Sequence, residues 1–286
     1  MVIDFRLRPP YGGFLQASMY FRPDRSAHMA SALRLPPAAC LTEPSLDRTF
    51  AEMDAAEVSL GVVPVRRGSG ALGDVSNEEV AAVVRKSAGR LIGFGAPNLQ
   101  DIPEGLADVA TIARSPEFAG VVVEPGLWRN PLYGDDRRLY PIYQACVDAE
   151  LPLIIMGGGN AGPDVSYTSP TIIDHICAEF PTLVVVAAHG GWPWVFETLH
   201  VAFRRPNLYL SPDMYLFGMP GWQSYVDAAT GFLADRLLFA TAYPFVELNA
   251  GMSAFKKMFG DEHHERLMST NAKRVLGSRV NFEGVR

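Results

Sequence analysis

The chain has 286 residues, 48% of them hydrophobic and 20% charged, which is the composition of a globular protein and excludes a disordered or fibrous one. The 31 acidic residues outnumber the 25 basic ones, and the net charge of −6 argues against nucleic-acid binding, which usually requires a basic excess. The three cysteines show no C-x-x-C spacing, so neither a structural zinc site nor a disulfide framework is expected.

The amino-terminal segment reaches the charged residues Asp4 and Arg6 before any apolar stretch long enough for a signal peptide. No apolar run approaches the ~18 residues of a membrane span. The sequence therefore predicts a cytoplasmic protein that is not embedded in a membrane.

Eight short apolar runs rich in Val, Ile and Leu are predicted strands, at 2–7, 59–65, 91–97, 120–125, 151–158, 182–190, 207–212 and 237–245. Between most of them apolar residues stand three and four apart, as Leu46, Phe50 and Met53 do, which is the spacing of a helix that covers a sheet. Ser76 and Glu79 form a predicted capping box.

Further helix starts are predicted at Ser169–Pro170 and near Pro193. Near-continuous apolar strands separated by helices indicate parallel βα units. Eight units in a chain of this length favour an α/β fold of the (β/α)8 TIM-barrel type, with residues 1–286 as a single domain. A doubly wound open sheet is the alternative.

An unusually long loop is predicted at residues 8–45, between the first strand and its helix, where about 2–6 residues are usual. It contains Phe14, Leu15, Met19 and Phe21, which cannot all be exposed without forming an apolar patch. We expect them to be partly buried, either as a lid against the barrel mouth or as an interface with another subunit. The second possibility predicts a homo-oligomer.

In such a barrel the reactive groups stand at the carboxyl ends of the strands. Arg6 and Arg8 lie two residues apart on the first strand, so both side chains can point into the barrel. One interpretation is an ion pair with Asp4, Glu124 or Asp213, and because an unpaired buried charge is costly, at least one arginine should be paired internally. The other interpretation is a planar fork for a carboxylate or phosphate.

His189 stands at a predicted strand end beside Gly190 and Gly191, and it can be either a structural histidine or a catalytic one. Glu124 also ends a strand. Its carboxylate can orient His189, pair with one of the two arginines, or act as a general base.

Five stretches resemble the amidohydrolase-2 branch of the amidohydrolase superfamily, which includes TIM-barrel hydrolases and carboxymuconate-semialdehyde decarboxylase-like enzymes. They are D-F-R-L-R at 4–8, A-H-G-G at 188–191, R-P-N-L-Y at 205–209, L-F-A-T-A-Y-P at 238–244 and N-A-K-R-V-L-G at 271–277. The resemblance covers nearly the whole chain in order. It implies a barrel with its site at the mouth and an activity on small carboxylated compounds.

The chain departs from this family at the usual metal ligands. Arg6 and Arg8 replace the two histidines of D-x-H-x-H, Met156 stands where the resemblance implies a histidine, and Ala242 stands where it implies an aspartate. Of the implied set His189 remains, whereas a catalytic zinc needs about three protein ligands. Guanidinium groups donate hydrogen bonds and repel cations. The sequence therefore predicts no metal and no other cofactor.

Two hypotheses follow. The first is a metal-independent enzyme that hydrolyses an ester or lactone, or decarboxylates, a small carboxylated compound. Its candidate catalytic residues are His189 and Glu124, and its candidate substrate-binding residues are Arg6, Arg8, Arg66, Arg129, Met156, Asp213 and Tyr243. The second hypothesis is a catalytically degenerate barrel that serves as an anion-binding or scaffold protein.

Overall fold

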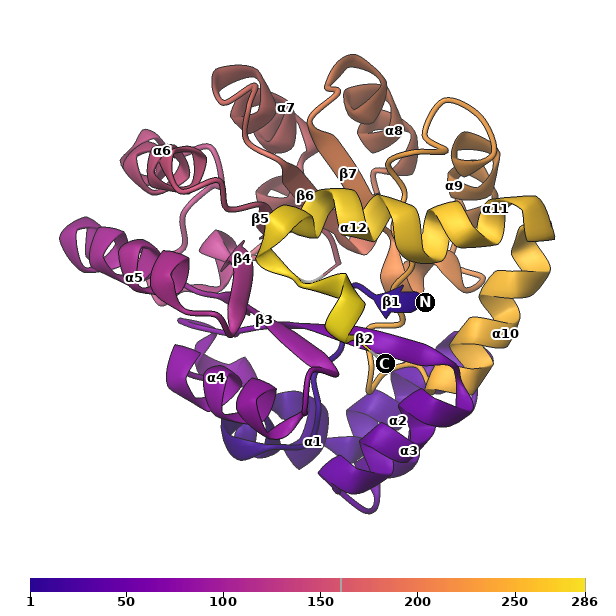
Figure 1. The fold of residues 1–286 in the computed structure, drawn as a ribbon. Coiled ribbons are helices and arrows are strands. Elements are labelled where there is room, and N and C mark those ends of the chain that lie inside the picture. The colour runs from indigo at the N-terminus through magenta and orange to yellow at the C-terminus, as the bar shows by residue number, and fades with distance from the viewer. Residues whose placement is uncertain (160, 286) are drawn as a thin grey trace.

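The computed structural model describes residues 1–159 and 161–285, and over these ranges it contains one parallel sheet of seven strands (Figure 1). The strands are β1 (Val2–Asp4), β2 (Val58–Pro64), β3 (Leu91–Gly95), β4 (Phe118–Val123), β5 (Leu153–Met156), β6 (Val185–Ala188) and β7 (Leu208–Ser211). Each strand pairs with the next in sequence. This order excludes the doubly wound alternative, in which the strand order reverses at a switch point.

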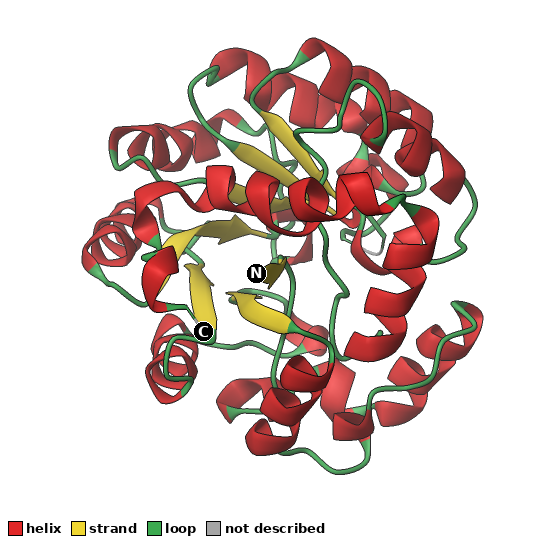
Figure 2. Ribbon diagram, turned by 45° about the vertical axis from the view of Figure 1, so that its right-hand side comes forward, coloured by secondary structure: helices red, strands yellow, loops and turns green. Residues whose placement is uncertain are grey.

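The sheet is curled, and helices surround its outer face (Figures 1 and 2). The helices are α1 (Ser18–Phe21), α2 (Pro23–Ala32), α3 (Leu46–Ala55), α4 (Asn77–Lys86), α5 (Ile102–Arg114), α6 (Tyr140–Asp148), α7 (Pro170–Glu179), α8 (Val195–Arg204), α9 (Trp222–Ala229), α10 (Leu248–Met258), α11 (Asp261–Glu265) and α12 (Asn271–Leu276). The architecture is TIM-barrel-like.

The helix starts follow their sequence signals closely. The capping box of Ser76 and Glu79 forms in full at the start of α4. Pro170 opens α7 as predicted, although the hydroxyl of Ser169 makes no capping hydrogen bond. In the described part of the chain every helix is too short or too polar to cross a bilayer.

The predicted eighth strand, 237–245, is not a regular strand. Leu237 and Tyr243 form isolated parallel bridges with Leu210 of β7 and with Leu7, just beyond β1. The segment therefore lies between the first and last strands and bonds to both. Its extended backbone is interrupted because Ala242 has a φ of 58° and Pro244 cannot donate to a ladder.

The segment 8–45 is not the irregular loop that the sequence predicts. It contains α1, α2 and two short 3-10 turns, Gly12–Gln16 and Ala39–Leu41. We call residues 12–41 the covering segment. Phe14 and Met19 are buried as predicted, whereas Leu15 and Phe21 are 37% and 51% exposed. Phe21 is the last residue of α1 and is exposed, whereas the three residues before it, Ser18, Met19 and Tyr20, are buried. Several covering-segment residues line the pocket described below, which favours the lid interpretation; a homo-oligomer stays a prediction.

Asp4, the last residue of β1, is a buried carboxyl beneath the candidate site. It accepts hydrogen bonds from the backbone N–H groups of Arg6 and Thr241 and from the hydroxyl of Thr241. Burial nevertheless raises the pKa of Asp4 from 3.8 to about 6.

Between those two pH values the folded protein binds a proton that the unfolded chain does not, so Asp4 makes stability fall as the pH rises through this window. Asp4→Asn removes the titration. As the pH rises through this window, the wild type should lose on the order of 2–4 kcal/mol of unfolding free energy relative to the variant. Urea unfolding at both ends measures this, with Asp227→Asn on the surface of α9 as the control. A difference independent of pH would contradict the expectation.

Candidate active site

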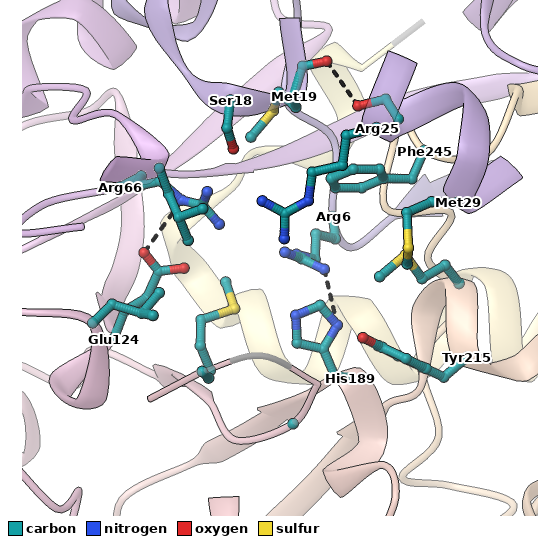
Figure 3. Close-up of a pocket in the computed structure, with 17 residues that line it drawn as sticks. Arg6, Ser18, Met19, Arg25, Met29, Arg66, Glu124, His189, Tyr215 and Phe245 are labelled. Atoms are coloured by element: carbon teal, nitrogen blue, oxygen red, sulfur yellow. Dashed lines mark hydrogen bonds and ion pairs between the residues drawn. The ribbon is translucent and has the colours of Figure 1, made fainter. Parts of the chain in front are cut away.

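A pocket opens at the carboxyl ends of the strands (Figure 3). Arg66 follows β2, Glu124 follows β4, Met156 ends β5 and His189 follows β6. We call it the mouth pocket. The other residues on its wall are Arg6, Ser18, Met19, Arg25, Ser26, Met29, Leu72, Leu127, Gly158, Ala161, Met214, Tyr215 and Phe245.

A buried triad of Arg6, His189 and Asp213 lies at one side of the pocket. Arg6 Nη1 donates to Asp213 Oδ2 over 2.9 Å, and the backbone N–H of His189 donates to the same oxygen over 3.2 Å. His189 Nδ1 lies 3.1 Å from each oxygen of Asp213. The predicted internal ion pair of one arginine is confirmed by the Arg6–Asp213 contact.

The backbone at this triad is strained. His189 has a φ of 64° and Asp213 a φ of 45°, both in the left-handed region that non-glycine residues rarely adopt. Such conformations cost about 1–3 kcal/mol each and cluster at functional sites. Here they turn the N–H of His189 toward the carboxylate of Asp213.

The tautomer of His189 follows from its neighbours. Nδ1 lies 3.1 Å from Arg6 Nη1 as well as near Asp213. An arginine can only donate and an ionised carboxylate can only accept, so one ring nitrogen cannot serve both. The bond to the carboxylate is the stronger of the two. Nδ1 therefore carries the proton, and the lone pair is on Nε2, which faces the pocket interior (Figure 3).

The charge states agree with this assignment. Burial, followed by the positive charge of Arg6, lowers the pKa of His189 below its usual 6.5. Burial by itself would raise the pKa of Asp213, but His189 and Arg6 together outweigh it and lower that pKa. At neutral pH the site thus holds a neutral imidazole oriented by an ionised carboxylate.

This arrangement predicts how His189 titrates in two variants. Arg6→Met removes a cation and should raise the pKa of His189, whereas Asp213→Asn removes the anion that stabilises the imidazolium and should lower it further. Nitrogen-15 NMR of the imidazole rings measures both shifts, and the ring of His175 on the outer helix α7 is an internal control. Equal pKa values of His189 in the three proteins would show that the triad is wrongly described.

Glu124 binds arginines rather than His189. Its Oε1 lies 3.4 Å from Arg8 Nη2, and its Oε2 lies 3.5 Å from Arg66 Nε and accepts from Ser69 Oγ over 3.1 Å. Burial would raise the pKa of Glu124, but Arg66 and then Arg8 outweigh it and lower that pKa. The idea that Glu124 orients His189 is wrong, because Asp213, after the neighbouring strand β7, already occupies Nδ1.

Several guanidinium nitrogens at this site are buried without a hydrogen-bond partner among the described residues. They are Arg6 Nε, Arg8 Nη1 and Arg66 Nε. Burial, and next the charge of Arg66, hold the pKa of Arg8 well below its usual value. Unmet buried donors of like charge are costly, so the site is suited to an anion.

The structure brings five of the predicted residues to the wall of the mouth pocket, namely Arg6, Arg66, Glu124, Met156 and His189. Arg8 and Asp213 lie behind the wall, in contact with residues that form it. Arg129 is exposed and Tyr243 places its hydroxyl 3.3 Å from Thr49 Oγ1, and neither is on the wall. A substrate-binding role for these last two thus lacks structural support.

Sequence reasoning missed Arg25, Ser18, Met29, Tyr215 and Phe245. The first three belong to the covering segment, whose sequence carries no motif. Tyr215 could have been predicted, because it follows Asp213 closely at a strand end. Its ring packs edge-on against His189, with ring centroids 5.2 Å apart, and stacks on Trp192.

The fold and the pocket at the strand ends define a TIM-barrel-like protein. The family model described as amidohydrolase matches residues 69–278, so the chain belongs to the amidohydrolase family. The predicted resemblance is confirmed. No curated protein matches the chain.

Solved structures support the same fold. An uncharacterised TIM-barrel protein from Bordetella bronchiseptica is 46% identical, with a TM-score of 0.91 over 96% of this chain and 98% of its own. A dihydroxybenzoic acid decarboxylase from Polaromonas sp. JS666, with bound manganese and the inhibitor 2-nitroresorcinol, is 17% identical with a TM-score of 0.71, over 98% and 99% of the two chains. The 5-carboxyvanillate decarboxylase from Sphingomonas paucimobilis is 17% identical with a TM-score of 0.65, over 98% and 99%. At 17% identity this likeness concerns the fold alone.

The side chains of this site do not fit a divalent metal ion. Over the ranges that the structure describes, no three His, Cys, Asp or Glu side chains gather as a metal-binding group. His189 and Asp213 do lie together, but Arg6 Nη1 is within hydrogen-bond distance of both. A guanidinium donor in that position repels a cation, and it already donates to Oδ2 of Asp213.

Proposed function

We propose that the protein is a decarboxylase-like enzyme that acts on a small carboxylated compound without a metal ion. The observation that carries the proposal is the His189–Asp213 pair, with Nε2 facing a pocket lined by arginines. Membership of the amidohydrolase family and the decarboxylases among the structural neighbours support it.

In this proposal Arg6 and Arg66 bind the substrate and stabilise the negative charge that develops during the reaction. The bond between the substrate carbon and the reacting carboxylate breaks, and its electron pair stays on the carbon. CO₂ leaves, and a proton from Nε2 of protonated His189 takes its place. A bound anion raises the pKa of a neighbouring imidazole, so the substrate itself favours the protonated form that this step needs.

Hydrolysis of an ester or lactone is the second candidate. It is favoured by the neutral imidazole of the free site, which is the form of a general base. Nε2 would take a proton from water as the oxygen attacks the carbonyl carbon. The arginines would stabilise the oxyanion, and the proton would pass to the leaving oxygen as the carbon–oxygen bond breaks.

Product analysis tests the proposal. Protein treated with a chelator, and checked for metals by elemental analysis, is incubated with carboxylated aromatics and with lactones. Released CO₂ supports decarboxylation, and oxygen-18 from labelled water in the product supports hydrolysis instead. Turnover that appears only after manganese or zinc is added would overturn metal independence. Tight anion binding without turnover would support the catalytically degenerate barrel.

A further inference from the structure

The mouth pocket contains more positive charge than its own carboxylates can balance. Guanidinium groups of Arg6, Arg25 and Arg66 reach its wall from three different parts of the chain, and among the described residues Glu124 is the one carboxylate on that wall (Figure 3). Arg6 follows β1 and Arg66 follows β2, whereas Arg25 belongs to α2 in the covering segment.

The ion pairs account for only part of this charge. Arg6 pairs with Asp213, and Glu124 is shared between Arg8 and Arg66. The side chain of Arg25 is exposed to solvent at the pocket opening and makes no ion pair or hydrogen bond to any residue that the structure describes. Arg6, Arg8 and Arg66 therefore share two carboxylates. With Arg25, which contacts no described carboxylate, the four guanidinium groups exceed the two carboxylates by two charges.

Arg25 has an acidic sequence neighbour that it does not use. Asp24 pairs with Arg22 on the surface, at 3.2 Å. The side chain of Arg25 instead points down into the pocket, above Arg6 and beside Phe245 (Figure 3). The turn that presents it is fixed, because Ser26 Oγ donates to the carbonyl oxygen of Met19 over 2.8 Å. The side chains of Arg25 and Arg6 carry like charges and face the same pocket, so an anion bound between them reduces their mutual repulsion.

We propose that the substrate carries a second carboxylate and that Arg25 binds it, while Arg6 and Arg66 bind the part of the molecule that reacts beside His189. This inference rests on the proposed function and narrows its substrate class to dicarboxylates. Arg25 is then a specificity-determining residue. Apolar side chains on the same pocket wall, those of Met19, Met29, Met156 and Phe245, suit the carbon skeleton that joins the two carboxylates.

Binding of matched acids tests the inference. Isothermal titration of the wild-type protein compares isophthalate with benzoate and glutarate with butyrate. Each dicarboxylate should bind roughly tenfold to a hundredfold more tightly than its monocarboxylate, as one charge-assisted hydrogen-bonded contact provides. Arg25→Gln should remove this preference, so that each dicarboxylate and its matched monocarboxylate bind with similar affinity. Arg22→Gln is the matched control from the same segment, because Arg22 is exposed and pairs with Asp24, and it should keep the preference.

The outcomes separate this inference from the proposed function. Equal affinity for both classes in the wild type, or an unaltered preference in Arg25→Gln, overturns the role of Arg25 while carboxylate binding itself still supports the proposed function. Failure of the folded wild-type protein to bind either class, with folding checked by circular dichroism, overturns both.

Discussion

Replacing His189 with alanine is expected to reduce turnover by roughly a hundredfold to ten-thousandfold, the range that a positioned general acid or base contributes. The imidazole is held by Asp213 on one side and presents Nε2 to the pocket on the other, so in either proposed reaction it is the group that moves the proton. Affinity for carboxylates should change little, because Arg6 and Arg66 remain. Steady-state kinetics on the substrate found by product analysis measures the loss in kcat.

Asp213→Asn should lower kcat too, since the amide can donate to Nδ1 and stabilise the wrong tautomer. If the two residues act as a unit, the double variant His189→Ala/Asp213→Asn should be no slower than His189→Ala alone. His175→Ala, on the outer helix α7, is the control that should retain activity. Wild-type kcat in His189→Ala would show that His189 is structural, as its burial against Tyr215 also allows.

The strands were predictable because their residues are buried on both faces of the sheet. In β4 and β5 every residue is buried, and a run such as Val121–Val123 is apolar at each position for that reason. The segment 237–245 has the same apolar composition but is not a regular strand. Composition does not reveal that Ala242 adopts a positive φ, or that the N–H of Thr241 donates to Asp4.

The partner of His189 could have been predicted from the fold. Strands that follow one another in sequence are neighbours in a barrel of this kind, so groups at the ends of β6 and β7 meet, while β4 is two strands from β6. Asp213 was therefore a better candidate than Glu124 for the carboxylate beside Nδ1. The tautomer of His189 and the direction of its pKa depend on distances to Arg6, which a sequence does not contain.

The position of Arg25 in the site could not be predicted from the sequence. It lies in a stretch of Gly, Pro and Arg for which the sequence predicts a loop, and its charged neighbours Arg22 and Asp24 are on the surface. Only the packing of α1 and α2 over the strand ends brings its side chain to the pocket (Figure 3). A residue that reaches a site from a distant segment through tertiary packing leaves no periodic or motif signal.

The other large effect is expected from replacing Arg6, whose guanidinium group contacts both His189 and Asp213. Arg6→Met should weaken the binding of carboxylates by about 2–5 kcal/mol, the cost of truncating one partner of a buried charge pair. It should also destabilise the fold by about 3–5 kcal/mol, because Asp213 loses the cation that donates to its Oδ2. Isothermal titration measures the first effect and urea unfolding the second.

The two effects can be separated by a second substitution. In Arg6→Met/Asp213→Asn the unpaired buried charge is gone, so most of the stability should return. Carboxylate affinity should stay low in the double variant, since the donor that faces the pocket is still missing. Arg129→Met, at an exposed position away from the pocket wall, is the matched control and should bind carboxylates as the wild type does. If affinity recovers together with stability, Arg6 supports the fold only and the anion lies elsewhere in the pocket, against Arg66 and Arg25.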